Sequence, residues 1–186
     1  MDTRQKIINA AADLILEEGL DATRVSKIAK RAGLTDGALY RHFDNKDDLL
    51  AEVYLDIAGE IEDHAKRFSQ QEGTTRERFT GFLEDLFGSF LRQPERLVLF
   101  ETLNRAASIK KENEAGALEQ TLSLLTTLLD EAKADKLIRR DIHNDVIIAA
   151  VYGALSQLVR ESFQKPRSVE RADLREVLDI FWRGTK

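Results

Sequence analysis

The chain has 186 residues, of which 42% are hydrophobic and 33% charged, and a formal net charge of −5. This length and apolar content predict a packed core in one large or two small domains rather than a disordered chain. The absence of cysteine excludes disulfides, thiolate metal sites and cysteine catalysis. No uninterrupted apolar run approaches the roughly 18 residues of a membrane helix, and the first residues are amphipathic rather than a secretory signal. We therefore expect a cytoplasmic protein without a membrane partner.

Helical periodicity and glycine positions predict three short helices within the first 45 residues. The first helix ends at Gly19, because glycine is the usual residue just past a helix end. We expect Thr23 to cap a second helix that ends at Gly33, and Thr35 to cap a third. Two helices joined by a short turn that contains glycine form a helix-turn-helix, whose second helix enters the major groove of DNA. The sequence predicts this motif over about residues 24–43.

Longer helices are predicted for the rest of the chain, and no alternating β-branched run indicates a strand. A helix of about six turns begins at Lys46, and after the polar stretch at 69–75 an apolar stripe runs from Phe79 until Pro94. Further helical segments are expected at about 96–110, 114–134, 146–163 and 169–183. The predicted fold is all-α with about nine helices, divided into a DNA-binding domain at residues 1–46 and a helical domain at 47–186. The last two helices carry more apolar surface than a monomer easily covers, which predicts a homodimer through them.

Basic charge is concentrated in the predicted helix-turn-helix. Residues 22–46 contain six basic and two acidic side chains, a net charge of +4, which leaves −9 for the rest of the chain. The basic residues are Arg24, Lys27, Lys30, Arg31, Arg41 and Lys46. A basic module attached to an acidic body is typical of nucleic-acid binding, although solvated helix faces explain the charge alone equally well.

The exposed side of the third helix suits close approach to DNA. Helical geometry directs Leu39 and Phe43 inward and leaves Gly37 and Arg41 on the opposite side. Small residues such as Gly37 and Ala38 let the backbone approach base edges, and an arginine reaches guanine or a phosphate. The sequence therefore predicts base reading by this helix.

The segment "TRVSKIAKRAGLTDGALYRHFDNKDDLL", residues 23–50, resembles the DNA-binding domain of the TetR (tetracycline repressor) family. The matching positions are Thr23, Ile28, Ala29, Ala32, Gly33, Leu34, Thr35, Leu39, Tyr40, His42, Phe43, Lys46 and Leu49. The resemblance implies a homodimeric transcriptional regulator, usually a repressor. Such a regulator leaves a palindromic operator when a small molecule enters the helical body.

By position, the resemblance implies DNA contacts from most residues of one set. This set comprises Thr23, Arg24, Ser26, Lys27, Thr35, Asp36, Gly37, Ala38, Tyr40, Arg41, His42 and Lys46. Lys27 is included as a residue of the second helix that, like Lys30 and Arg31, either reaches the DNA backbone or is simply solvated. Tyr40 and Lys46 are expected on phosphates. Ser26 stands where the family commonly has arginine. Asp36 either accepts from a cytosine or only favours the start of its helix, and His42 either touches DNA or packs against the fourth helix.

An apolar ligand pocket is expected in the helical domain, for a drug, lipid or acyl chain, with no cofactor. Its candidate residues, each of which also has an ordinary core or interface interpretation, are His64, Phe87, Phe100, Asn104, Arg105, Tyr152 and Gln157. His64 and His143 lack neighbours at metal-ligand spacing, so no metal site is expected.

Two other classes of function compete with a DNA-binding regulator. A helical enzyme would need carboxylates such as Glu84 and Glu101, but no catalytic motif accompanies them, so we expect no enzyme activity. A helical protein-interaction module would not explain why the basic charge is confined to the helix-turn-helix.

Overall fold

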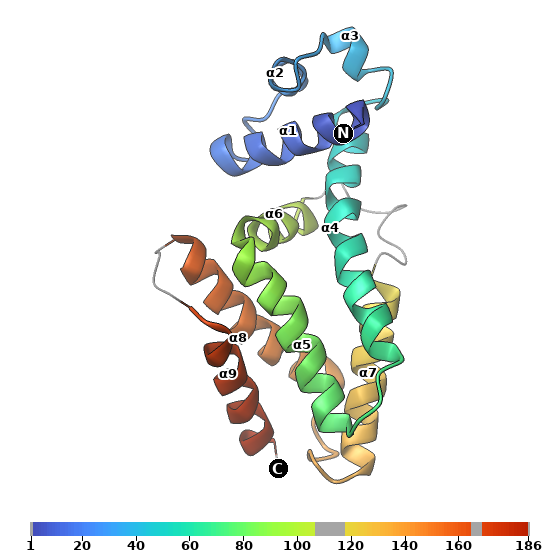
Figure 1. Ribbon diagram of the computed structural model, residues 1–186, viewed down its shortest axis with the longest axis vertical. Coiled ribbons are helices and arrows are strands. Elements are labelled where there is room, and N and C mark those ends of the chain that lie inside the picture. The colour runs from blue at the N-terminus through green and yellow to red at the C-terminus, as the bar shows by residue number, and fades with distance from the viewer. Residues whose placement is uncertain (1, 107–117, 165–168, 186) are drawn as a thin grey trace. The chain divides into compact units, whose positions relative to one another are not determined.

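The computed structural model describes residues 2–106, 118–164 and 169–185, and within these ranges the chain forms nine α-helices (Figure 1). They are α1 (Thr3–Glu18), α2 (Val25–Arg31), α3 (Asp36–Leu39), α4 (Lys46–Ser69), α5 (Thr75–Arg92), α6 (Pro94–Asn104), α7 (Glu119–Ala134), α8 (Asn144–Gln164) and α9 (Arg171–Gly184). The all-α prediction is confirmed. The parts of the predicted segments 96–110 and 114–134 that fall at 107–117 lie outside the described residues.

The chain packs as two compact units. The N-terminal unit comprises Met1–Gly59 with Val98–Ala117, and the C-terminal unit comprises Glu60–Leu97 with Leu118–Lys186. Helices α4 and α6 therefore contribute residues to both units. The division into 1–46 and 47–186 stays a prediction, because it concerns which residues bind DNA and which bind a ligand.

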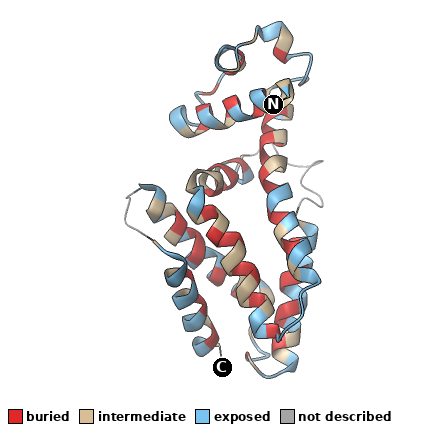
Figure 2. Ribbon diagram, in the orientation of Figure 1, coloured by how far each residue is buried: buried red, intermediate tan, exposed pale blue. Residues whose placement is uncertain are grey.

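The N-terminal unit has a core in which α1 packs against α2, and α2 against α3. Ile7, Ile28, Leu39 and Phe43 are almost completely buried, at 0 to 2% exposure. Figure 2 shows buried positions, in red, along the helices of this unit. These residues recur at helical spacing in the sequence, and burial of such apolar side chains is the main favourable term in folding. The inward direction predicted for Leu39 and Phe43 is confirmed.

The turn between α2 and α3 depends on Gly33. Its φ of 72° lies in the left-handed region, which glycine enters without a steric penalty. The amide N–H of Leu34 then donates to the carbonyl of Ala29 at 2.8 Å, which closes the end of α2. The Thr35 hydroxyl accepts a hydrogen bond from the Ala38 amide at 3.3 Å, as predicted for the cap of α3.

Thr23 differs from the cap that the sequence predicts. Arg24 occupies the N-cap position of α2, and no side chain caps this helix. The Thr23 hydroxyl instead donates to the carbonyl oxygen of Gly19 at 2.8 Å, and the residue is only 1% exposed. Thr23 therefore stabilises the connection that follows α1.

The C-terminal unit is built around α5, which packs against α7, α8 and α9. The buried rings of Phe79, Phe82 and Phe87 lie on α5. At the other end of the chain, Trp182 of α9 donates its indole N–H to the Thr80 hydroxyl at 3.0 Å. The last helix is thereby held on α5 by both apolar and polar contacts.

Helix α8 is the one helix in the described ranges that is long and apolar enough to cross a membrane, on length and composition alone. Only 28% of its most apolar 18-residue stretch is buried. Val146, Tyr152 and Phe163 are among its exposed large apolar side chains, at 59%, 37% and 44% exposure. An apolar face of this kind is also expected of a helix that packs against another subunit.

Candidate DNA-binding surface and ligand pocket

The recognition segment, residues 36–43, begins with the one short helical turn of α3 and continues partly as tighter turns. Beyond the last residue of α3, Arg41 donates its amide to Ala38 at 3.4 Å and His42 donates to Leu39 at 2.9 Å. These two bonds have three-residue spacing, whereas Phe43 donates to Leu39 at 3.2 Å with the four-residue spacing of an α-helix. The regular α-helix is therefore shorter than the predicted motif, although the coiled chain continues to Phe43. Burial of Leu39 and Phe43 directs the other side of this segment into solvent.

Most of the predicted DNA contacts are accessible on the N-terminal unit. The exposed members are Arg24, Ser26, Lys27, Thr35, Asp36, Gly37, Tyr40, Arg41 and His42. Ala38 and Lys46 are half-buried, and Thr23 is buried. Tyr40 is 51% exposed, which is unusual for an aromatic side chain without a partner surface. This segment therefore presents small, aromatic and basic groups together.

Two basic residues of α2 are held by carboxylates at the end of α1. Lys27 Nζ lies 2.6 Å from Glu18 Oε2, and Arg31 Nη1 donates to Glu17 Oε1 at 2.7 Å. The hydrogen bond from Arg31 lowers the pKa of the Glu17 carboxyl and raises that of the guanidinium. Arg41 makes no ion pair with any other described residue. The charge available to DNA is therefore smaller than the sequence count indicates.

A contact of Arg4 with α4 and Phe43 also shapes the N-terminal unit, and no pattern in the sequence predicts it. Arg4 Nη1 donates to Glu52 Oε2 at 2.8 Å, and its guanidinium lies 4.9 Å from the centre of the Phe43 ring. The contact joins α1 to α4 beneath the recognition segment. Periodicity within one helix cannot predict it, because the partners are 48 residues apart.

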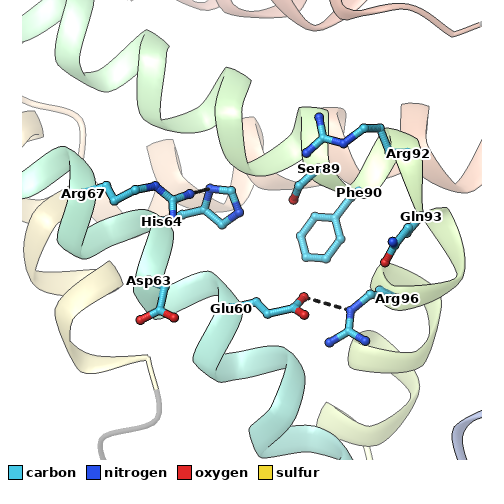
Figure 3. Close-up of a pocket in the computed structure, with 9 residues that line it drawn as sticks. All are labelled: Glu60, Asp63, His64, Arg67, Ser89, Phe90, Arg92, Gln93 and Arg96. Carbon is cyan, nitrogen blue, oxygen red and sulfur yellow. Dashed lines mark hydrogen bonds and ion pairs between the residues drawn. The ribbon is translucent and has the colours of Figure 1, made fainter. Parts of the chain in front are cut away.

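A pocket of about 270 Å³ lies within the C-terminal unit. It is lined by Glu60, Asp63, His64, Arg67, Ser89, Phe90, Arg92, Gln93 and Arg96 (Figure 3). Phe90 is the single apolar residue in this lining, so the surroundings of His64 are more polar than the expected apolar pocket. Arg96 lies 2.9 Å from Glu60, whereas Arg92 makes no ion pair within the described ranges.

His64 and Arg67 share the carboxylate of Asp85. Asp85 Oδ2 lies 2.7 Å from His64 Nδ1 and 3.2 Å from Arg67 Nη2. Arg67 Nη2 is also 2.7 Å from Nδ1, which cannot accept from arginine while it donates to the carboxylate. Burial acts to raise the pKa of Asp85, but hydrogen bonds from His64 and Arg67 lower it overall. Asp85 is therefore an ionised anchor beside the pocket.

The other predicted ligand residues do not line this pocket. Phe87 contacts Tyr152 in the C-terminal unit, with ring centres 5.9 Å apart. Phe100 stacks on Tyr54 in the N-terminal unit at 5.3 Å. Their burial and ring contacts give Phe87 and Phe100 a sufficient role in the core.

Apart from His64, the polar members of the predicted ligand set lie at the surface. Asn104 and Arg105 are exposed at the end of α6, where Arg105 lies 3.4 Å from Glu101. Gln157 is also exposed and donates to Glu161 on α8. In the described ranges, no three His, Asp or Glu side chains are grouped as metal ligands would be.

Known proteins share both the N-terminal sequence and the whole fold. Residues 7–53 match the profile of the family described as "Bacterial regulatory proteins, tetR family". A fatty acid metabolism regulator protein of Bacillus subtilis is 27% identical over 158 residues, which cover 83% of this chain and 80% of that protein.

Two solved structures resemble the fold over nearly its full length. A TetR family transcription regulator from Marinobacter aquaeolei VT8 has a TM-score of 0.84 at 23% identity, covering 98% of this chain and 95% of that one. The transcriptional regulator FadR of Bacillus subtilis, in complex with stearoyl-CoA, has a TM-score of 0.78 at 23% identity, covering 98% and 99%. Residues 7–53 therefore match the DNA-binding module of the TetR family of bacterial regulatory proteins, and the chain as a whole has the fold of these solved transcriptional regulators.

Proposed function

We propose that this protein is a homodimeric cytoplasmic repressor that binds a palindromic operator and leaves it when a small molecule binds the helical domain. The observation that carries the DNA-binding part is the exposed segment of Gly37, Tyr40 and Arg41 above the buried Leu39 and Phe43. Small residues allow close approach, and arginine is the side chain that most often reads guanine. The basic charge of residues 22–46 supports this assignment.

Some of the proposed contacts position the protein on the DNA backbone, and others read the base sequence. Tyr40 and Lys46 hold phosphates, while Arg41 and the small residues of α3 meet base edges in the major groove. Thr23 acts through the α1–α2 connection, because its side chain is buried. Asp36 is exposed in the first turn of α3, where an acid suits the helix dipole, and this supports a structural role.

The proposed dimer forms through α8 and α9. Val146 of α8 and Ile180 of α9 are 59% and 64% exposed in the monomer. Covering such side chains with the same face of a second copy would remove apolar surface from water and produce a two-fold axis. Two-fold symmetry of the protein matches a palindromic operator with half-sites about one turn, or a multiple, apart.

The proposed effector combines an acyl chain with an anionic end. A relative of this chain is named as a fatty acid metabolism regulator, and a protein of similar fold is described in complex with stearoyl-CoA. The polar pocket around His64 supports an anionic end, because Arg92 there has a guanidinium free of described ion pairs. Its binding must favour a state in which the dimer no longer fits the operator.

Operator selection from random duplexes, followed by base-by-base substitution, tests the proposal. We expect a palindromic consensus, and we expect Arg41→Ala to cost about 1 to 3 kcal/mol at one base pair of each half-site. Equal loss on every sequence would instead assign Arg41 to the backbone. Stearoyl-CoA should release the wild-type protein from the selected operator. Failure of CoA, stearate and stearoyl-CoA alike would reject this effector class.

A further inference from the structure

The last turn of α1 ends in two consecutive acids, Glu17 and Glu18, beside the basic helix α2. Acidic side chains are unfavourable at the C-terminus of a helix, where the dipole is negative. No basic residue occupies this turn of α1 to compensate. The two acids are compensated instead by Arg31 and Lys27 of the neighbouring helix. Local helix stability therefore does not explain their position.

These ion pairs are accessible and can be exchanged for other partners. The side chains of Lys27 and Glu18 are 48% and 34% exposed, and those of Arg31 and Glu17 are 34% and 55% exposed. Exposed ion pairs add little to folding stability and are weakened by salt. A DNA phosphate can therefore replace either carboxylate, but only by competing with a negative charge that is already in contact.

The negative charge of Glu17 and Glu18 is large compared with the net positive charge of the helix-turn-helix. Glu17 and Glu18 together offset half of the +4 carried by residues 22–46. Affinity for any DNA sequence rises with each phosphate that a cation neutralises, because counterions are released. A lysine or arginine already neutralised within the protein contributes less of this gain. The carboxylates therefore act against sequence-independent binding.

We propose that Glu17 and Glu18 restrain Lys27 and Arg31 from phosphate contacts, and that this lowers the affinity of the protein for DNA of every sequence. The inference rests on the proposed function, because it assigns these residues a role in DNA binding. Base contacts by α3 are unaffected by the restraint. Stable binding at low protein concentration is then reserved for sequences in which α3 adds its base contacts.

The test compares the full-length wild type with the double variant Glu17→Gln/Glu18→Gln. Fluorescence anisotropy would measure affinity for a random duplex and for the selected operator, at salt concentrations from about 50 to 200 mM. We expect affinity for both duplexes to rise about three- to tenfold, with a salt slope steeper by about 0.9 for each released cation. The ratio of the two affinities should remain as in the wild type.

A matched control separates position from net charge. Glu72→Gln/Glu119→Gln removes the same charge from two exposed carboxylates of the C-terminal unit and should leave the salt slope unchanged. Lys27→Gln should reduce random-duplex affinity more in a Glu18→Gln background than in the wild type, since Lys27 is free only there. If thermal unfolding shows that the double variant is not folded, the single variant Glu18→Gln takes its place in the same binding measurements.

Three results would contradict the proposal that Glu17 and Glu18 restrain Lys27 and Arg31. The first is an unchanged random-duplex affinity and slope in a folded double variant while the wild type binds its operator. The second is an equal rise in the control variant, which would show a general charge effect. Absence of any DNA binding by the wild type would overturn the proposed function together with this inference.

Discussion

The side-chain ammonium of Lys46 donates a hydrogen bond to the main-chain carbonyl oxygen of Leu20, at 3.1 Å. Lys46 is the first residue of α4, and Leu20 lies in the connection after α1, so the bond joins two points 26 residues apart. An ammonium has three donors, and this bond uses one of them. Lys46 can therefore hold the helix-turn-helix together while its remaining donors reach a phosphate.

Replacing Lys46 should reveal both roles. We expect Lys46→Ala to lower the free energy of unfolding by about 1 kcal/mol, since one part-buried hydrogen bond is lost. The salt slope of DNA binding should also fall by about 0.9, as expected for one lost phosphate contact. Tyr40→Phe is the comparison, because it removes an uncharged donor and should weaken binding on all sequences without changing the slope. If Lys46→Ala leaves the salt slope of DNA binding unchanged, Lys46 has only a structural role and makes no phosphate contact.

Two glycines in similar surroundings allow the close approach of α3 to DNA to be tested. A Cβ atom added at Gly37 or at Gly59 meets no atom within 4 Å, and both residues lie in helices. Alanine should therefore raise the free energy of unfolding by about 0.5 to 1 kcal/mol at either site. Only Gly37→Ala should weaken operator binding, because its methyl group would meet base edges. Equal operator affinity of both variants would contradict close approach at Gly37.

Charge introduced on α9 should separate the subunits. Ile180 is 64% exposed, so Ile180→Glu should preserve the fold of the monomer while placing two carboxylates in the proposed interface. Light scattering at micromolar concentration should then report a monomer with weakened operator binding. Leu122→Glu, at a 52% exposed residue of α7, is the matched change outside that interface and should leave a dimer. A monomeric wild type would contradict the assignment.

The anchor formed by Asp85 predicts a specific dependence of stability on pH. Its pKa is lower in the folded protein, so its stabilising contribution is complete above the unfolded value of about 3.9 and is lost as pH falls through the folded value. We expect Asp85→Asn to reduce the melting temperature at neutral pH, and the difference from wild type to narrow below about pH 4. Asp63→Asn, at an exposed carboxylate, should show no comparable narrowing. A constant difference across this range would argue against an ionised Asp85.

Local sequence information determined the helical architecture and the identity of the N-terminal module. Apolar residues at helical spacing place Ile28 and Leu39 in the core, and Gly33 and Thr35 mark a turn and a cap through their own backbone and hydroxyl chemistry. These signals act within a few residues, so they can be read without a fold. The cap predicted at Thr23 is wrong, because a threonine hydroxyl can donate to a carbonyl as well as accept from an amide, and here it donates to Gly19.

Tertiary structure decided which charges remain available and what surrounds each candidate ligand residue. The partners Lys27 with Glu18, and Lys46 with Leu20, come from different helices or connections, and periodicity does not specify how such elements face each other. The same reason explains why His64 lies in a polar pocket, since Asp85 and Arg92 belong to a neighbouring helix. The sequence by itself determined the helices and the DNA-binding motif, because those depend on near neighbours. The fold alone decided the electrostatics, because charge interactions depend on distances in space.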